Sequence, residues 1–495
     1  MSKETRLLDI ALQYHQRGNL KQAKAIYAQI LSQSPEDAEA LHLLGVACYQ
    51  EGDYESSIGL IYKAISINPL NYHFFINMGN VLQEFNRFED AVSAYKKALS
   101  LNPTDPMIYN NLGNALQNLG MMDKAIKVYN MSLRINPTSA TTYNNLGTGL
   151  KAKSMFEEAV LAYKESISLS NDFAEAHDNL GKILLLLGDF REGFLNYEWR
   201  LKHPSFLKVS GLGEFEKPMW DGSPFHGKRL LVHYEQGFGD TINFIRYLPM
   251  VKERGGDVSF VCQPPLEKLF ANFPGIDLLH TVEETIDLNY DFYIPLLSLP
   301  YIFNTTLATI PASIPYIKPD KELSLKWHNR LIEDHKLKVG IVWASNSKNY
   351  KLRNRSIGLK AFTPLFDVDG ISLYSLQKGP EIEEIKYISS NMKLIDYTNQ
   401  INDFSDTAAF IDNLDLVISV DTAVAHLAGA MAKNVWLLLQ KVPDWRWLLD
   451  KEDSPWYPTM RIFRQQEDRD WNSVIRSVKD ALCNRRDARP CVSTI

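Results

Sequence analysis

Residues 103–137 read PTDPMIYNNLGNALQNLGMMDKAIKVYNMSLRINP, and the same arrangement recurs along the first two fifths of the chain. Similar residues recur every 34 positions, as from Gly79 to Gly113, and each set of equivalent positions forms a column. The columns are Gly45, Gly79, Gly113, Gly147 and Gly181; Ala23, Ser57, Ala91, Ala125, Ala159 and Gly193; Tyr27, Ile61, Tyr95, Tyr129, Tyr163 and Tyr197; and Pro35, Pro69, Pro103 and Pro137. A fixed period of this length predicts an α-solenoid, because each repeat buries its apolar face against the next.

Each column has a physical reason. Small residues let the two helices of a repeat approach closely, and the aromatic residue fills the space between them. Proline ends the second helix of a repeat. The pattern resembles the tetratricopeptide repeat, and the resemblance covers about residues 4 to 200 as six units. We therefore predict a tetratricopeptide array over residues 1–203, with binding along its concave face.

A fifth column concerns what the array binds. It consists of Asn77, Asn111, Asn145 and Asn179, each two positions before the glycine. In tetratricopeptide arrays this position lines the inner groove, and a carboxamide can clamp an extended peptide backbone as both donor and acceptor. Protein O-GlcNAc transferase carries a similar asparagine ladder for its protein acceptors. The resemblance therefore implies an acceptor-peptide site, and the alternative is a polar, solvated helix face.

The helical period ends near His203, and residues 204–227 are rich in turn residues, which predicts a linker. Strands and helices then alternate, with RLLVHYEQ as a strand and TINFIRYLPMVKERG as a helix. Two such series predict two doubly wound lobes over residues 228–335 and 336–482, followed by a flexible tail over 483–495. Ligands bind beyond the carboxyl ends of strands in open sheets, so we expect site residues in the turns after strands.

Six stretches of the second half carry a more specific resemblance. They are WDGSPFHGKRLLVHYEQGFGDTINFIRYLP, VGIVWAS, RNRSI, SLQKGP, DFSDTAAFIDNLDLVISVDTAVAHLAGA and PDWRWLLDKEDSPWYPTMRIFRQ. In this order they are similar to the heptosyltransferase-like GT-B glycosyltransferases of family 9, in the branch fused to tetratricopeptide repeats. A more distant likeness is to the catalytic half of protein O-GlcNAc transferase. The resemblance implies a GT-B fold of two Rossmann-like lobes, with the nucleotide-sugar donor on the C-terminal lobe, the acceptor toward the N-terminal lobe, and no metal.

The stretch VISVDTAVAHLAG places Asp421 at a strand end and Thr422 at a helix start. The backbone N–H groups of Thr422 and Ala423, with the positive end of the helix dipole, form a ready diphosphate site. His426 would point toward the same cleft one turn later. Taken alone, Asp421 is an ordinary helix cap and His426 a core residue. The matching Asp-Thr-x-x-x-His motif of the family favours donor binding.

In GFGDTINF, Asp240 opens a helix in the N-terminal lobe. The matching aspartate of heptosyltransferases is a candidate general base that deprotonates the acceptor hydroxyl, and a base must lie within hydrogen-bond reach of that proton. The ordinary interpretation is again a helix cap, and the two roles are compatible. Glu235, at the end of the preceding strand, is the alternative base.

Further donor-site candidates follow the strands of the C-terminal lobe. Lys378 in SLQKG would neutralise charge on the leaving nucleotide diphosphate, and Gln377 would contact the base or ribose. Arg353 and Arg355 in KLRNRS would clamp phosphates, and Ser345 begins the same turn. Without the family, a solvated loop is the simpler interpretation of the lysine and the arginines. Arg446, in a stretch rich in tryptophan and proline, is a weaker candidate.

Composition narrows the function further. A net charge of -6 disfavours nucleic-acid binding, and four cysteines without CxxC spacing indicate free thiols in a reducing compartment. We find no signal peptide and no apolar segment long enough to span a bilayer, so we expect a cytoplasmic protein. The histidines show no metal-ligand spacing, and Asp367-Val368-Asp369 is best interpreted as a surface turn, so we expect no metal and no cofactor.

The sequence therefore favours a bacterial glycosyltransferase that moves a sugar from a nucleotide-sugar to a hydroxyl of a protein acceptor held by the repeats. Flagellin or another surface protein is the acceptor that the architecture suggests, and a single base without an evident nucleophile favours inversion. Two alternatives stay open: a transferase acting on a lipopolysaccharide or lipid-linked glycan, and an inactive repeat scaffold. The sugar and the nucleotide are left open, as is homo-oligomer formation, since repeat arrays sometimes pair edge to edge.

Overall fold

The computed structural model describes residues 3–203, 215–281, 289–345, 355–389 and 392–484. The chain divides into two compact units, Met1–Asn179 and Leu180–Ile495. The division falls inside helix α11 (Ala174–Leu186), in the sixth of the predicted repeats. The second helix of that repeat, α12 (Phe190–Tyr197), therefore belongs to the same unit as the sheets.

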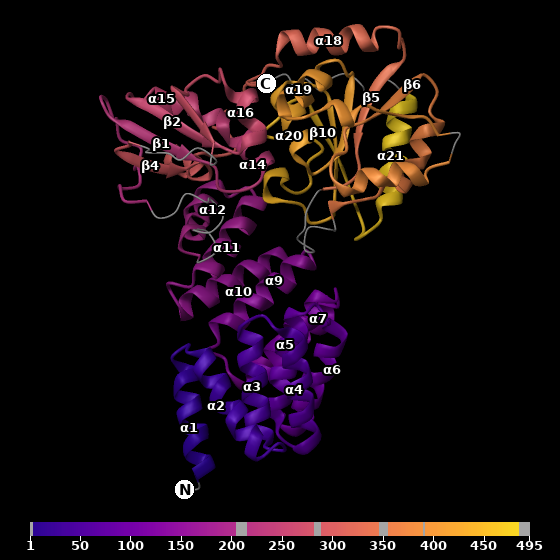
Figure 1. The fold of residues 1–495 in the computed structure, drawn as a ribbon. Coiled ribbons are helices and arrows are strands. Elements are labelled where there is room, and N and C mark those ends of the chain that lie inside the picture. Colours follow the sequence, from indigo (N-terminus) through magenta and orange to yellow (C-terminus); the bar gives the residue numbers. More distant parts are fainter. Residues whose placement is uncertain (1–2, 204–214, 282–288, 346–354, 390–391, 485–495) are drawn as a thin grey trace. The chain divides into compact units, whose positions relative to one another are not determined.

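The first unit is a solenoid in which each helix packs against the next (Figure 1). Several of its helices begin at a side-chain cap, such as Asp37 and Ser139, each of which accepts a backbone N–H three residues on. The helices are α1 (Lys3–Gln16), α2 (Leu20–Gln33), α3 (Ala38–Gln50), α4 (Tyr54–Ile67), α5 (Tyr72–Glu84), α6 (Phe88–Leu101), α7 (Pro106–Asn118), α8 (Met122–Ile135), α9 (Ala140–Ala152), α10 (Phe156–Leu169) and the start of α11.

The glycine column brings the paired helices into contact. A methyl group added to Gly113 would lie 2.3 Å from Cε1 of Tyr129, and one added to Gly79 would lie 2.5 Å from Cε1 of Tyr95. Both tyrosines are fully buried, and the Tyr129 hydroxyl donates to Oδ1 of Asn114 at 2.7 Å. Each of these tyrosine rings thus packs directly on the glycine of the paired helix, as the two columns predict.

The turn between the two helices of each repeat contains one residue in the left-handed region. These residues form another column of the repeat, with φ between +60° and +90°: Gly18, Gly52, Asn86, Gly120, Ser154 and Gly188. Glycine adopts this conformation without steric cost and asparagine tolerates it, whereas serine does so rarely. Ser154 therefore indicates that helix packing, and not local preference, fixes the turn.

The second unit contains two sheets in which every strand pair is parallel. The four-stranded sheet, with order β3-β2-β1-β4, belongs to the N-terminal lobe, and the six-stranded sheet, with order β10-β9-β8-β5-β6-β7, to the C-terminal lobe. The strands are β1 (Arg229–His233), β2 (Asp257–Cys262), β3 (Leu278–Thr281), β4 (Phe292–Pro295), β5 (Leu337–Val342), β6 (Ile371–Ser375), β7 (Leu394–Asp396), β8 (Leu416–Val420), β9 (Val435–Leu439) and β10 (Met460–Arg464). The predicted fold class, a solenoid followed by two Rossmann-like α/β lobes, is confirmed.

Short helices connect these strands. The segment predicted as one helix after β1 is instead three short pieces, because Pro249 cannot continue the helical hydrogen bonds. The α-helices are α14 (Phe238–Phe244), α15 (Leu248–Lys252), α16 (Glu267–Phe270), α17 (Leu299–Ile302), α18 (Lys321–Leu331), α19 (Phe404–Asp412), α20 (Ala423–Ala430) and α21 (Trp471–Asn484). The 3-10 helices are η1 (Glu198–Lys202), η2 (Ile245–Tyr247), η3 (Pro264–Leu266), η4 (Leu296–Ser298), η6 (Leu359–Asp367), η7 (Pro380–Tyr387), η8 (Thr398–Gln400) and η9 (Trp445–Trp447).

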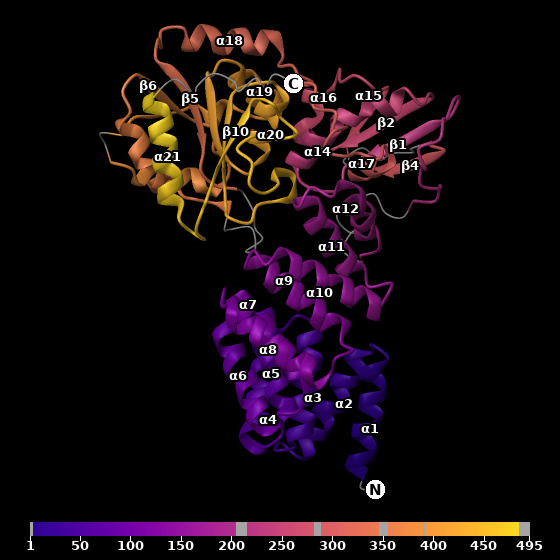
Figure 2. The same cartoon turned by 180° about the vertical axis from the view of Figure 1, so that it is seen from behind.

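Each sheet has one pair of neighbouring strands at which the strand order reverses. In the N-terminal lobe this switch point lies between β1 and β4, and in the C-terminal lobe it lies between β5 and β8. Helices α14 and α20, which follow β1 and β8, lie side by side in Figures 1 and 2. The loops at the two switch points, where open sheets bind ligands, thus lead into α14 and α20, and these two helices touch.

We expect Gly113→Ala to destabilise the first unit by about 1–3 kcal/mol, because the new methyl group overlaps the Tyr129 ring and the core cannot absorb it. Gly59→Ala is the matched control: Gly59 lies inside α4 with no atom within 4 Å of the added methyl. It should stabilise the unit by about 0.5–1 kcal/mol through helix propensity.

Thermal unfolding followed by far-UV circular dichroism checks both changes. The nine tryptophans all lie at or after Trp199, so tryptophan fluorescence reports on the second unit. The melting temperature that it gives should be unchanged in both variants. A Gly113→Ala protein as stable as the Gly59→Ala protein would contradict the close packing of the two columns.

Candidate functional site

A small pocket lies at the switch point of the C-terminal lobe. Asp421 directly follows β8, which is the neighbour of β5 in the sheet. The residues that line the pocket are Arg355, Asp421, Leu438, Leu439, Gln440, Pro443 and Asp444. Two carboxylates and a guanidinium therefore share the place where sheets of this type bind ligands.

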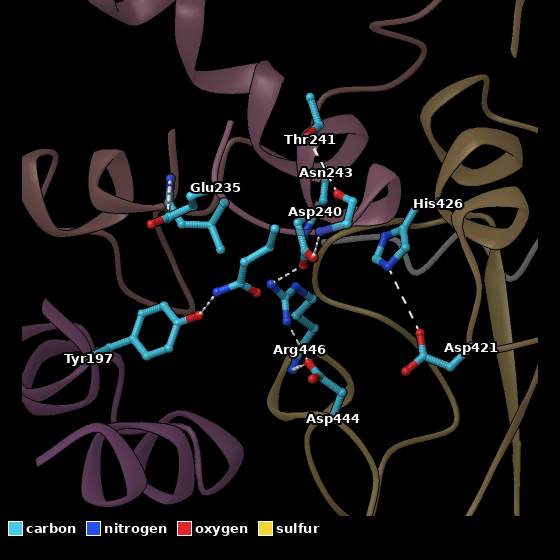
Figure 3. Close-up of polar contacts among 12 residues, drawn as sticks. Tyr197, Glu235, Asp240, Thr241, Asn243, Asp421, His426, Asp444 and Arg446 are labelled. Carbon is cyan, nitrogen blue, oxygen red and sulfur yellow. Dashed lines mark hydrogen bonds and ion pairs between the residues drawn. The ribbon is translucent and has the colours of Figure 1, made fainter. Parts of the chain in front are cut away.

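Five charged side chains, Asp240, Arg446, Asp444, Arg355 and Asp421, form one continuous charge network. Figure 3 shows Arg446 between Asp240 and Asp444. Arg446 donates from Nη2 to Oδ1 of Asp240 and from Nη1 to Oδ1 of Asp444, the latter at 2.7 Å. Arg355 lies between Asp444 and Asp421, with Nη2 3.4 Å from Oδ2 of the former and Nη1 3.0 Å from Oδ2 of the latter. Carboxylates and guanidiniums alternate, so each guanidinium has a carboxylate on both sides.

Burial and neighbouring charges act against one another on the pKa values in the charge network. Burial raises the pKa of Asp240, although Arg446 favours its carboxylate form. Burial likewise raises the pKa of Asp421, against the effect of Arg355. Burial also favours protonation of Asp444, but Arg446 and Arg355 together hold its pKa below the ordinary value. Asp444 is therefore the carboxylate that stays ionised most strongly.

Asp240 also caps its own helix. It is the third residue of α14, and its Oδ2 accepts the backbone N–H of Gly237 at 3.0 Å. The carboxylate at this position satisfies a backbone donor that the helix leaves free. One oxygen of Asp240 thus belongs to the helix N-terminus and the other to Arg446, and its role as a base stays a prediction.

His426 lies in α20 against the first turn of α14. A methyl group on Gly239 would lie 2.8 Å from Cδ2 of His426, so glycine is what permits this contact. Nδ1 of His426 lies 2.9 Å from the Tyr457 hydroxyl, which donates to Asn243 Oδ1 at 3.0 Å. That hydroxyl therefore accepts from Nδ1–H, which leaves Nε2 as a hydrogen-bond acceptor. Nε2 lies 4.0 Å from Oδ1 of Asp421, and burial lowers the pKa of His426 to about 3.

Thr422 is the N-cap residue of α20 and Ala423 its first residue. The Thr422 side chain forms no cap hydrogen bond and instead lies 2.9 Å from the Ser419 hydroxyl. The first turn of α20 therefore receives no side-chain oxygen from its own cap, a geometry that suits an external anion.

Glu235 lies in a different environment from Asp240. Its side chain is fully buried, and both oxygens accept hydrogen bonds from Arg200 of η1, at 2.8 and 3.2 Å. Oε1 also accepts the backbone N–H of Leu297 at 3.2 Å. Burial raises the pKa of Glu235 and Arg200 opposes that rise. Glu235 is thus enclosed by protein donors, and its alternative role as a base stays a prediction.

Three further candidates lie after β5 and β6. Gln377 Oε1 accepts the backbone N–H groups of Trp343 and Ala344 at 3.1 and 2.9 Å, which ties the ends of β5 and β6 together. Nζ of Lys378 donates to the carbonyls of Thr398 and Ile401 at 2.7 and 2.8 Å. Ser345 donates its N–H to Ser356 Oγ at 3.1 Å. Within the described residues, none of the three bonds to the charge network.

Of the predicted phosphate-clamping arginines, Arg355 joins the charge network, and Arg353 lies outside the described residues. The structure therefore brings together Asp240, Asp421, Arg355 and His426. It places Gln377, Lys378 and Ser345 at neighbouring strand ends of the same sheet, without direct contact to the network.

Comparisons with known proteins agree on the first unit. Tetratricopeptide repeat families match residues 8–72 and 106–139, and a TPR repeat family matches residues 79–120. The N-terminal solenoid is a tetratricopeptide-repeat array.

A curated relative extends beyond the repeats. Protein FlbA of Caulobacter vibrioides is 27% identical over 290 residues, which cover 53% of this chain and 48% of FlbA. The chain thus spans about half the length of this relative.

Several solved structures resemble part of the chain. MamA is 23% identical with a TM-score of 0.32, covering 35% of this chain and 94% of its own. PilF of Pseudomonas aeruginosa is 22% identical with a TM-score of 0.37, covering 40% and 90%. YrrB, described as a TPR protein with an unusual peptide-binding site, is 23% identical with a TM-score of 0.31, covering 34% and 88%.

Within the tetratricopeptide array, the predicted asparagine ladder forms a row of contacts between successive repeats. Each Nδ2 lies near a polar side chain of the preceding repeat. The pairs are Asn77 with His42 at 2.7 Å, Asn111 with Asn80 at 3.1 Å, Asn145 with Asn110 at 3.0 Å and Asn179 with Asn144 at 2.9 Å. The ladder therefore has a structural role, and its peptide-binding role stays a prediction.

Sequence reasoning missed several residues that hold the site together. Asp444 and Arg200 each bind a predicted candidate, and Tyr457 and Asn243 set the orientation of His426. Asp444 stands two residues before Arg446 in PDWRW, and this spacing was the one available signal. The others are joined only by the fold.

The described residues include no group of three or more histidine, cysteine, aspartate or glutamate side chains arranged to hold a metal ion. Asp367, of the Asp-x-Asp turn, lies 3.6 Å from Lys479. Within the same part of the chain, no helix has the length and apolarity to cross a membrane.

We expect His426 to make the second unit less stable in mild acid. Histidine titrates near 6.5 in an unfolded chain, whereas the pKa of His426 is about 3, so the unfolded chain binds more protons between these values. Its contribution is therefore lost as the pH falls below about 6.5. From pH 7 to pH 5, the wild type should lose about 2 kcal/mol more unfolding free energy than His426→Gln.

Denaturant unfolding followed by tryptophan fluorescence at several pH values measures this difference. His328→Gln, which removes an exposed histidine from α18, is the matched control. Equal pH dependence in the wild type and His426→Gln would show that His426 does not remain neutral in the folded protein.

Proposed function

We propose that this chain is a metal-independent GT-B glycosyltransferase that moves a sugar from a nucleotide-sugar to a hydroxyl group of a protein acceptor. The observation that carries the proposal is the charge network, in which Asp240 of the N-terminal lobe bonds Arg446 of the C-terminal lobe and is linked through Asp444 and Arg355 to Asp421. Two lobes that are each built on a parallel sheet support it, as does the resemblance of the motifs to heptosyltransferase-like enzymes. The whole-chain activity, its substrates and its partners are all part of this proposal.

The donor would bind at the switch point of the C-terminal lobe. Its diphosphate would accept hydrogen bonds from Arg355 and from the first-turn amides of α20, at Thr422 and Ala423. His426 is neutral, and its Nε2 accepts hydrogen bonds, so it suits a ligand hydroxyl better than a phosphate oxygen. Lys378 would reach the same donor from the end of β6, whereas the Gln377 carboxamide is bonded on both sides to the protein and would support this strand end.

The reaction needs one base. The acceptor oxygen attacks the anomeric carbon as the bond from that carbon to the diphosphate breaks, and the acceptor proton passes to Asp240. The nucleoside diphosphate leaves with the electron pair of the broken bond, stabilised by Arg355 and by Lys378. A single displacement of this kind inverts the anomeric configuration.

Arg446 links donor binding to the base. It bonds one oxygen of Asp240, which must be exposed to receive a proton. A donor diphosphate competes for Arg446 and Arg355 with the three carboxylates of the charge network. Binding of the donor would therefore free Asp240 for the acceptor, which predicts that the donor binds first.

The acceptor would be a protein segment along the tetratricopeptide array. The asparagine ladder uses Nδ2 for contacts between repeats. Its carboxamide oxygens can still accept from the backbone N–H groups of an extended peptide. Flagellin or another surface protein, modified in the cytoplasm before export, is the acceptor class that this architecture suggests.

We expect one nucleotide from a panel of UDP, GDP, ADP and CMP forms to raise the melting temperature of the second unit, because a ligand that binds only the folded state stabilises it. Tryptophan fluorescence would follow the transition. Arg355→Gln should remove the shift, and EDTA should not affect it.

Arg476→Gln is the matched control, because it removes an exposed arginine from α21. It should leave the shift intact. No shift with any nucleotide or nucleotide-sugar would contradict the proposal and favour an inactive scaffold.

We expect Asp240→Asn to lower kcat by about 10²–10⁴-fold while the nucleotide shift is retained, because the variant removes the base but not the donor contacts. Sugar transfer from the stabilising donor to proteins of the native host would be the assay. Incorporation into lipid-linked glycan instead of protein would establish the alternative acceptor, and full activity of Asp240→Asn would exclude Asp240 as the base.

A further inference from the structure

The switch point of the N-terminal lobe is filled by a side chain from the end of the repeats. Arg200, in η1 just after α12, reaches between the loops that follow β1 and β4. It bonds Glu235 of the first loop and the Ser298 hydroxyl of the second, at 2.8 and 2.9 Å from Nη2. A crevice that commonly receives a ligand is therefore closed here by the chain's own guanidinium.

All five N–H bonds of this guanidinium are used. Besides the bonds to Glu235 and Ser298, Nη1 donates to the carbonyl of Tyr197 at 3.1 Å and to Oε1 of Glu198 at 2.6 Å, and Nε donates to Glu235 at 3.2 Å. The Arg200 side chain is 6% exposed, and that of Glu235 is 0% exposed. Arg200 has no donor left over for a substrate, and both oxygens of the enclosed Glu235 are bonded to protein donors, so the function of the pair is to hold the loop after β1.

Tyr197 holds the next residue of the same loop. Gln236 donates from Nε2 to the Tyr197 hydroxyl at 2.8 Å, and its carbonyl accepts from Nε2 of Gln263 at 2.9 Å. Gly237 follows, and its N–H binds Asp240 at 3.0 Å. The anchored residues therefore lie three to five positions before Asp240.

The same helix, α12, also touches the loop that carries Arg446. The ring of Trp445, the residue before Arg446, packs edge-on against Phe194 and Tyr197, with centroids 5.7 and 6.0 Å apart. Helix α12 and η1 thus contact the residues that flank both partners of the Asp240–Arg446 pair. A shift of this helix would move the two partners relative to each other.

We propose that Arg200 and Tyr197 are positioning residues of the site, and that Glu235 is the anchor of Arg200 and not the base. The last helix of the repeat array is then a structural part of the active site in the second unit. This inference rests on the proposed function for its kinetic consequences. Its structural content, the placement of residues 234–240 by α12 and η1, stands on the contacts alone.

Tyr197→Phe tests this with the least disturbance, because it removes one hydroxyl and keeps the ring on Trp445. We expect kcat to fall about 10- to 100-fold with KM for the donor unchanged, since a misplaced base slows the chemical step. Amide hydrogen exchange of residues 234–240 in the full-length protein should become faster while the melting temperature of the second unit stays the same.

Tyr129→Phe is the matched control, because it removes the hydroxyl of another tyrosine in the same column, in the first unit. It should leave kcat and exchange at residues 234–240 unchanged. Wild-type kcat and wild-type exchange in Tyr197→Phe would overturn the positioning role. If the wild type transfers no sugar at all, the proposed function fails, and the exchange comparison still decides the positioning role.

Glu235→Gln separates the anchor from a base. We expect kcat to fall about 10-fold with the acidic limb of the pH profile retained, because that limb belongs to Asp240. A loss of 10³-fold or more together with the limb would assign Glu235 as the base and overturn the proposal. If this variant does not fold, Arg200→Met with Glu235→Leu removes both buried charges at once, and it should show the same retained limb.

Discussion

The ion pair between Asp240 and Arg446 is the interaction on which the site of the second unit depends. The two residues lie 206 positions apart and follow strands of different sheets. Arg446 is almost fully buried and also bonds Asp444, so loss of Asp240 would leave it with one carboxylate partner in the network instead of two. The packing around the pair must therefore hold both loops in place, and Gly239 against His426 and Phe244 near Trp445 do so.

The same requirement explains why polar contacts between the lobes gather along α14 and η2. Arg246 of η2 donates to the carbonyl of Trp456 at 2.8 Å, and Asn243 accepts from Tyr457 at 3.0 Å. These contacts fix the helix that carries Asp240 to residues of the C-terminal lobe. The two lobes consequently form one compact unit.

Sequence alone predicted the repeats well, because the period places each glycine and tyrosine in a column whose packing is local. It also predicted the strand-end turns that carry Asp240 and Asp421, because motif and strand lie next to each other in the chain. It did not predict the partners of these residues. Arg446 reaches Asp240, and Arg200 reaches Glu235, only through the tertiary fold. The prediction of one helix over 241–255 overlooked Pro249, the signal in the sequence that divides it.

The network of five charges, in which Arg446 and Asp421 are buried and the other three side chains are 20–24% exposed, is not the most stable way to join two lobes. Apolar side chains of similar volume usually stabilise a protein as well or better, and this junction already has Phe244, Trp445 and Trp456 in contact. Under the proposed function, the charges serve a ligand that exchanges with them. An anionic donor would replace carboxylates as the partner of the guanidiniums, and a carboxylate released in this way would accept a proton. The guanidiniums would then stabilise the charged leaving group, as the proposed transfer requires.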